Sequence, residues 1–176
     1  MYERKEKIIT KPSKANKRIS YWGVSPHMVI ILTPFTILFA LLHFIFFPVF
    51  LLPFEQIYMI IIGLSLIIIG AIIYIKSLKL IKKAYFASEL VTSGVYGHMR
   101  HPLYSSFILF IYPGIICMFN SWILFFIPIV HYTIFRFLIK REENYCLKMF
   151  GEKYIHYKKF VYAIFPKLKK YESLKD

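Results

Sequence analysis

The chain has 176 residues, of which 58% are hydrophobic and 19% aromatic, and it carries a formal net charge of +14. This composition indicates an integral membrane protein, and the length leaves no room for a separate soluble catalytic domain beside four membrane crossings. The two cysteines, Cys117 and Cys146, lack the paired spacing of a metal site or a disulfide framework, so no metal is expected.

The first half of the chain predicts two membrane crossings. Residues 1–26 carry seven Lys or Arg and lack the apolar core of a signal peptide, which indicates a basic cytoplasmic tail. Uncharged residues then predict spanning helices over about 27–47 and 56–75, joined by a proline-bounded turn. In the second helix Gly63 and Gly70 share a face, which fits either close helix packing or the ordinary glycine content of membrane helices.

A basic amphipathic stretch follows the second predicted crossing. Residues 76–86 alternate lysines with apolar side chains, a pattern suited to lying in the headgroup region. We therefore treat residues 27–90 as two transmembrane helices and an amphipathic connector.

A helical hairpin is predicted next. Pro102 suits the first turn of a helix, and the uncharged run of 102–119 is about 27 Å long at helical rise, enough to cross a hydrocarbon core. Asn120 and Ser121 break the run, and a further helix is expected from Trp122 through about residue 141. A turn at this break places residues 100–104 at the membrane level of residues 141–143.

The distribution of charge predicts the topology. All 23 Lys and Arg residues fall on one side of a four-helix arrangement, as the positive-inside rule requires. Both termini and both polar clusters are thus expected in the cytoplasm, at the cell membrane of a prokaryote or the endoplasmic reticulum of a eukaryote. Residues 142–176 mix aromatic and basic side chains and predict a segment held at the interface, with 167–176 as its tail. The expected fold class is an all-α bundle of about four transmembrane helices.

The polar clusters admit more than one interpretation. A helix N-terminus favours an anion, and Arg100 and His101 add hydrogen-bond donors, although Arg100 also fits an interfacial anchor and His101 a helix-entry residue. Glu142 and Glu143 lie unfavourably at a cytoplasmic helix end. They could hold a ribose diol, or neighbouring basic side chains could neutralise them.

The order and spacing of these motifs resemble the isoprenylcysteine carboxyl methyltransferase and phospholipid methyltransferase superfamily. The resemblance covers residues 92–166, while residues 1–91 share only the hydrophobic layout. The Arg-His-Pro-x-Tyr element, the hairpin, the paired glutamates and Phe-Gly-x-x-Tyr-x-x-Tyr together make the likeness specific. The residues that carry it are Ser93, Gly94, Val95, Tyr96, Arg100, His101, Pro102, Leu103, Tyr104, Glu142, Glu143, Phe150, Gly151, Tyr154, Tyr157, Val161 and Pro166.

This resemblance implies S-adenosylmethionine as the methyl donor, bound in region 91–166. It implies catalytic roles for Arg100, Glu142 and Glu143, with one glutamate serving the cofactor and one near the reacting groups, and Arg100 or Arg141 orienting an anionic substrate group. The implied cofactor-binding residues are Gly94, Tyr96, His101, Pro102, Leu103, Tyr104, Glu142, Tyr154 and Tyr157.

Some of these assignments have competing explanations. Tyr154 and Tyr157 fit interfacial anchors equally well. Val95 stands where the family usually has proline and Cys146 where it has leucine, which puts the turn geometry in question more than the chemistry.

The methyl acceptor stays open at this level. A prenylated cysteine carboxylate, a phospholipid amine, a small thiol and an isoprenoid-like lipid are all compatible, with membrane lipids as partners, no nucleic acid and no prediction of oligomeric state. One alternative is a nicotinamide-dependent sterol or steroid reductase, which shares the Arg-His-Pro-x-Tyr element. Another is a non-catalytic protein that binds anionic lipid through its basic faces.

Overall fold

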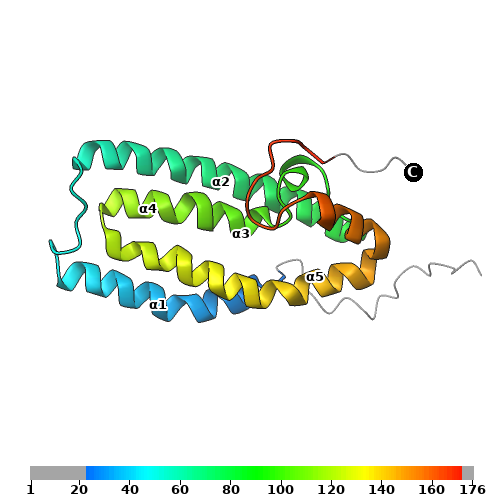
Figure 1. The fold of residues 1–176 in the computed structure, drawn as a ribbon, viewed down its shortest axis with the longest axis horizontal. Helices are drawn as coiled ribbons and strands as arrows, with labels where there is room; N and C mark the ends of the chain where they lie inside the picture. The colour runs from blue at the N-terminus through cyan, green and yellow to red at the C-terminus, as the bar shows by residue number, and fades with distance from the viewer. Residues whose placement is uncertain (1–22, 172–176) are drawn as a thin grey trace, which may run out of the picture.

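The computed structural model describes residues 23–171, which form an elongated bundle of helices without a sheet (Figure 1). Four helical stretches are long and apolar enough to cross a membrane, which confirms the expected all-α membrane bundle. The elements are α1 (Ser25–Ile45), α2 (Gln56–Ala87), η2 (Gly94–Gly97), α3 (Pro102–Ser106), η3 (Phe107–Ile111), α4 (Tyr112–Phe119), η4 (Trp122–Phe125) and α5 (Phe126–Phe160).

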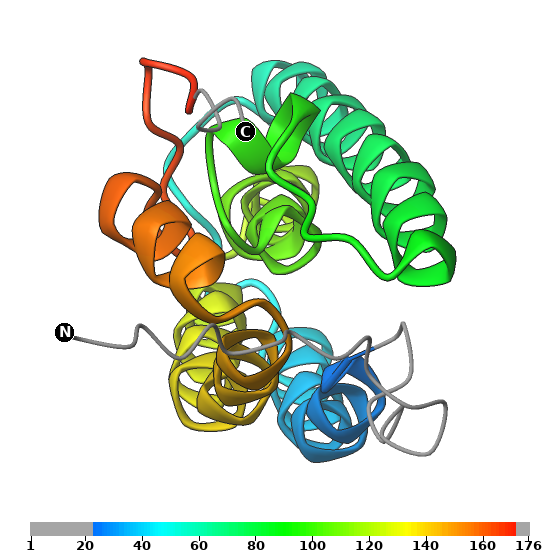
Figure 2. The same cartoon turned by 90° about the vertical axis from the view of Figure 1, so that its right-hand side faces the viewer.

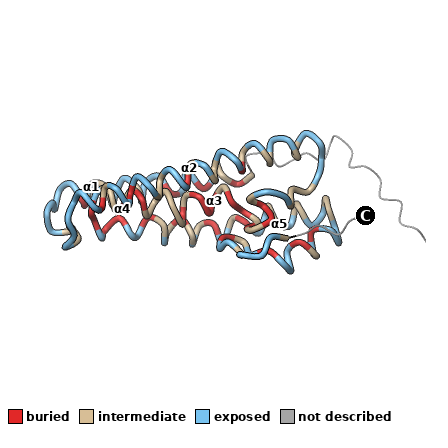
Figure 3. Tube along the Cα trace, turned by 90° about the horizontal axis from the view of Figure 1, so that it is seen from above, coloured by how far each residue is buried: buried red, intermediate tan, exposed pale blue. Residues whose placement is uncertain are grey.

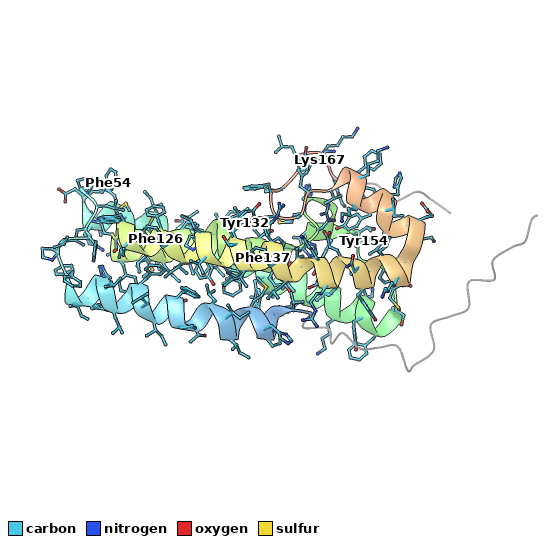
Figure 4. The ribbon with its side chains drawn as sticks, turned by 60° about the horizontal axis from the view of Figure 1, so that its bottom comes forward. Phe54, Phe126, Tyr132, Phe137, Tyr154 and Lys167 are labelled. Atoms are coloured by element: carbon cyan, nitrogen blue, oxygen red, sulfur yellow. The ribbon has the colours of Figure 1, made fainter. Side chains whose placement is uncertain are left out.

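The bundle consists of two helix pairs. Helix α2 packs along α3, η3 and α4, which together form the third crossing, and α1 packs along α5 (Figures 1 and 2). The outer faces carry many exposed large apolar side chains, including Phe54, Phe126 and Phe137 (Figures 3 and 4). A surface of this kind suits lipid rather than water, and helices satisfy their own backbone hydrogen bonds there.

Glycines bring α2 into close contact with the third crossing, at α4 and η3. A Cβ atom added at Gly63 would lie 2.6 Å from the carbonyl oxygen of Gly114, and one at Gly70 would lie 2.7 Å from Cγ1 of Ile111. No larger residue fits without moving a helix. The predicted shared face of Gly63 and Gly70 is therefore a packing face, with Gly114 contributing from the opposite helix.

The end of the bundle without the polar clusters is closed by its two loops. Asn120 takes the left-handed conformation that ends α4, and Ser121 forms an isolated bridge with Leu51. The side-chain amide of Asn120 donates to the carbonyl of Phe54 at 2.9 Å. The predicted hairpin turn is confirmed, and the same two residues also tie the hairpin to the first connection.

Two helices extend further than we expected. Residues 76–86, expected as a connector in the headgroup region, form the last three turns of the continuous α2. Helix α5 runs to Phe160 and is kinked at Gly151, whose φ of 51° is accessible to glycine at little cost. The lysines of α2 occur at helical spacing without a breaker, so nothing in the sequence ends the helix before Ser88, which is left-handed.

The segment after α5 folds back onto the loop that precedes α3. The backbone N–H groups of Arg100 and His101 donate to the carbonyls of Tyr162 and Ala163 at 2.8 and 3.0 Å. Further along, Lys167 and Tyr171 donate through their backbone N–H groups to residues 97 and 98 of the same loop. The predicted C-terminal segment is therefore part of the folded structure as far as residue 171, while most of the predicted N-terminal tail and residues 172–176 lie outside the described residues.

Replacing Gly63 with leucine should destabilise the bundle by about 1 to 3 kcal/mol, because the new side chain meets the backbone of α4. A lowered midpoint of thermal unfolding in detergent would measure this effect. Ser65→Leu is the matched control, since it adds bulk to an exposed position of the same helix. Equal midpoints for the two variants would contradict the packing described above.

Candidate active site

The two polar clusters meet at one end of the bundle. The loop after α2 passes through η2 and enters α3 at Pro102, which places Arg100 and His101 just before the helix. Helix α5 passes the same point with Glu142 and Glu143. Figure 4 shows Tyr154, from the C-terminal part of α5, at the same end of the bundle as Lys167 and opposite to Phe54. The level predicted from the hairpin is thus confirmed by direct contacts between the clusters.

Glu143 and Arg100 form a nearly buried ion pair. Nη2 of Arg100 donates to Oε1 of Glu143 at 2.8 Å, and their side chains are only 10% and 12% exposed. Nζ of Lys158 donates to the second oxygen of Glu143 at 2.7 Å, and Nε2 of His101 lies 3.4 Å from the first. The carboxylate of Glu143 is therefore engaged on both oxygens by protein groups.

Arg100 also holds the C-terminal segment. Its Nη1 donates to the backbone carbonyls of Lys158 and Val161, which lie at the end of α5 and just after it. The guanidinium of Arg100 therefore binds two parts of the chain, Glu143 before the Gly151 kink and the backbone after it. These bonds hold the C-terminal segment against the site. The Nε atom of Arg100 is buried and has no hydrogen-bond partner within residues 23–171.

Glu142 has a different environment. The hydroxyl of Tyr104 donates to Oε2 of Glu142 at 3.0 Å and accepts a hydrogen bond from Oγ of Ser25 at 3.2 Å. Nδ1 of His101 lies 3.9 Å from the other oxygen of Glu142. Gly23 lies so close that an added Cβ would be 2.6 Å from Oε2. The chain before α1 therefore covers this carboxylate.

A cavity lies beside Glu142, between the α2–α3 loop and α5. Among its lining residues are eight that the sequence predicts for the site: Tyr96, Arg100, His101, Leu103, Tyr104, Glu142, Tyr154 and Tyr157. Gly94, Pro102 and Glu143 lie outside the lining, and Glu143 faces a second hollow with Lys158. Arg141 is exposed and does not line the cavity either.

Tertiary contacts add residues that the sequence analysis did not single out. Gly23 and Glu89 line the cavity, and Ser25 reaches it through Tyr104. No motif marks these three positions, since their roles come from where α1 and the end of α2 lie. Phe150, which belongs to the quoted pattern, also lines the cavity, and so does Cys146, which stands where the family usually has leucine.

The cavity walls combine fixed polar groups with apolar surface. The hydroxyl of Tyr157 donates to the carbonyl of Tyr96 at 2.6 Å, which locks η2 against α5. Burial is the main cause that raises the pKa of Tyr96 above its usual value, so this phenol stays protonated at neutral pH. Tyr154 lines the cavity, and its hydroxyl is buried without a hydrogen-bond partner among the described residues. Together with Glu142, these groups suit a ligand that has a positive charge, hydroxyls and an apolar ring.

Comparisons with known proteins point to one family. A sequence model of the phospholipid methyltransferase family matches residues 57–153, more than half of the chain. The protein-S-isoprenylcysteine O-methyltransferase of Dictyostelium discoideum is 31% identical over 77 residues, which are 44% of this chain and 32% of that protein. The aligned part thus spans about a third of the length of that relative. The matched residues include the hairpin, the Arg-His-Pro-x-Tyr element and both glutamates, and the chain belongs to the phospholipid methyltransferase family.

Proposed function

We propose that this protein transfers a methyl group from S-adenosylmethionine to a lipophilic acceptor at the cytoplasmic face of a membrane. The observation that carries the proposal is the cavity where the Arg-His-Pro-x-Tyr element meets Glu142, in a chain that belongs to a family of methyltransferases. The cytoplasmic orientation is supported by the Lys and Arg residues within 23–171, which occur only from Lys76 to Arg100 and from Arg136 onward, toward the ends of the helices that form the site.

The lining of the cavity fits S-adenosylmethionine. The carboxylate of Glu142 suits a cationic or hydroxyl-bearing group, and Tyr154 and Arg100, which line the same cavity, each have one buried polar atom without a partner among the described residues. Leu90 and Phe150 supply apolar side chains in the same lining. When bound, S-adenosylmethionine supplies an electrophilic methyl group.

The two glutamates have separate tasks in this proposal. Glu142 lines the cavity and accepts one hydrogen bond from a side chain, so it has capacity left for the cofactor. Glu143 is held by Arg100 and Lys158 and acts as a positioning residue for Arg100. Arg100 in turn holds the C-terminal segment and lines the cavity.

Tyr104 connects the cavity to the acceptor side. Its hydroxyl is fixed by Ser25 and Glu142, and its ring also lines an apolar cavity toward the membrane. An acceptor that enters from lipid would thus meet the methyl donor at Tyr104 and Leu103, which line both cavities. A carboxylate acceptor is already ionised at neutral pH and needs no base, whereas an amine or thiol would need to lose a proton. The name of the Dictyostelium relative supports the carboxylate of a prenylated cysteine.

A nicotinamide-dependent reductase is less well supported. The Arg-His-Pro-x-Tyr element is common to both classes, but the paired glutamates and the family match favour a methyltransferase. The two classes differ in cofactor, so binding separates them directly.

Titration calorimetry of the detergent-purified protein is expected to show saturable binding of S-adenosylhomocysteine and none of a reduced nicotinamide cofactor. The reason is the acidic and aromatic lining of the cavity. Binding of the nicotinamide alone would replace the proposal with a reductase. Binding of neither would favour a protein that only binds anionic lipid.

Glu142→Gln should weaken S-adenosylhomocysteine binding by about tenfold to a hundredfold, because a hydrogen bond to a charged group contributes about 1.5 to 3 kcal/mol. The same titration measures the loss. Glu152→Gln, at an exposed position of the same helix, is the matched control and should bind as the wild type does. Wild-type affinity in the Glu142 variant would count against this carboxylate as a ligand.

Glu143→Gln should act mainly on structure. Loss of the charge leaves Arg100 without its carboxylate partner and should destabilise the fold by about 2 kcal/mol. Hydrogen exchange at the backbone N–H groups of Arg100 and His101 should accelerate, since these groups donate to the C-terminal segment. If protection there is unchanged while cofactor affinity falls, Glu143 contacts the cofactor instead.

A further inference from the structure

A surface hollow of about 330 Å³ lies where the C-terminal segment packs against α5. Tyr132, Phe135 and Arg136 line this Arg136 hollow from the helix, and residues 162–165 line it from the segment. It shares no lining residue with the cavity at Glu142 or with the apolar cavity beside Tyr104. The Arg136 hollow is therefore a separate site, to which the proposed function gives no role.

Arg136 brings an unpaired positive charge to this hollow. Its side chain is exposed, and it has no hydrogen-bond or ion-pair partner among residues 23–171. The nearest acidic residues along α5 are Glu142 and Glu143, about 9 Å or more further along the helix axis. Other side chains already bind both of these carboxylates. The described part of the chain thus offers no anion to the guanidinium of Arg136.

The depth of Arg136 makes this unpaired charge costly. The fourth crossing begins at Trp122, and Arg136 follows fourteen residues later, about 21 Å at helical rise. A hydrocarbon core is about 30 Å thick, and a charged side chain that faces lipid within it reaches for the headgroups or for an anion. Tyr162 and Phe165 of the hollow are 61% and 60% exposed, as aromatic side chains at a membrane–water boundary are. The long side chain of Arg136 therefore reaches the level of the lipid phosphates.

The surface around the Arg136 hollow suits a phospholipid. Tyr132 and Ile129 lie one and two turns before Arg136 on the same face of α5, toward the middle of the membrane (Figure 4). Ile129 is 59% exposed, so this face can carry acyl chains. Lys140 is exposed one turn after Arg136 and adds a second positive charge on the headgroup side. A phosphate at Arg136 would thus have apolar surface below it and a further cation above it.

We infer that the Arg136 hollow binds an anionic phospholipid, with the lipid phosphate on the guanidinium of Arg136 and the acyl chains along Tyr132 and Ile129. A guanidinium can donate two parallel hydrogen bonds to one phosphate, and Arg136 has no competing partner among the described residues. The negative charge of the lipid compensates the cation that α5 carries into the membrane.

Phe135 separates this lipid from the site of methyl transfer. Its ring is fully buried, and ring centroids lie 5.6 Å from that of His101 and 5.3 Å from that of Tyr104. The backbone carbonyls of residues 162 and 163, which line the Arg136 hollow, accept hydrogen bonds from the loop before α3. The bound lipid is therefore distinct from the methyl acceptor, and it supports the C-terminal segment from outside the active site.

Displacement of radiolabelled phosphatidylglycerol from the full chain in detergent tests this inference. Unlabelled phosphatidylglycerol should displace the label at about tenfold lower concentration than phosphatidylcholine, because Arg136 and Lys140 favour a lipid with net negative charge. Arg136→Gln should reduce this preference to about twofold, the loss expected for one cation at the membrane surface. A wild-type ratio near one, absence of specific binding, or an unchanged preference in the variant would overturn the inference. Displacement by inorganic phosphate would indicate a site for a soluble anion and would also overturn it.

The matched control is Lys148→Gln. Lys148 is an exposed cation of the same helix that lines neither the Arg136 hollow nor the cavities described above. This variant should keep the wild-type preference, and an equal loss in both variants would contradict the assignment to Arg136. If Arg136→Gln is not monodisperse in gel filtration, Arg136→Met takes its place. The assay contains no cofactor, so a failure of S-adenosylhomocysteine binding would affect the proposed function and leave this result standing.

Discussion

The arrangement of the site depends on the ion pair between Arg100 and Glu143. A guanidinium and a carboxylate that are both nearly buried must pair, because an isolated charge there would lose its hydration without compensation. Arg100 precedes α3 and Glu143 lies on α5, so the pair connects the two arms of the hairpin. The same guanidinium bonds to carbonyls at the end of α5, which turns the C-terminal segment into a wall of the site. One pairing thus joins three parts of the chain.

The helix pairs show how packing decides where ligands can bind. Gly63 and Gly114 let α2 and α4 approach until their backbones touch, which leaves no space between them. Between the pairs, buried side chains such as Met28, Tyr104 and Phe135 form a common cluster, and a cavity remains beside it. Lipid tails are as apolar as the helices, so close helix contact in a membrane depends on shape. The helix face that carries glycine therefore determines which two helices pack together without a gap.

In the proposed function, the two cavities divide a methyl transfer between water and lipid. The first holds the carboxylate and the tyrosines and lies where the loops meet α5. The second is apolar except for a few side chains and lies along the helices. Tyr104 stands between them, with a hydroxyl fixed by Glu142 on one side and Ser25 on the other. This separation would let a lipid reach the donor while its chain stays out of water.

The sequence by itself determined the number of crossings, the hairpin turn at Asn120–Ser121 and the meeting of Arg100 with the glutamates. The length of each apolar run determines how many helices can cross the membrane. Residues at equal distances before and after the hairpin turn lie at the same membrane depth, so both features follow from the local sequence. The extension of α2 through its lysines was missed because amphipathic spacing does not show whether a helix bends. Only the tertiary structure decided which glutamate faces the cavity, that Gly23 lines it, that Ser25 binds Tyr104, and that His131 lines a space between helices. Neighbouring residues on a helix share a depth but face different directions, and which partner each one meets depends on how the other helices pack.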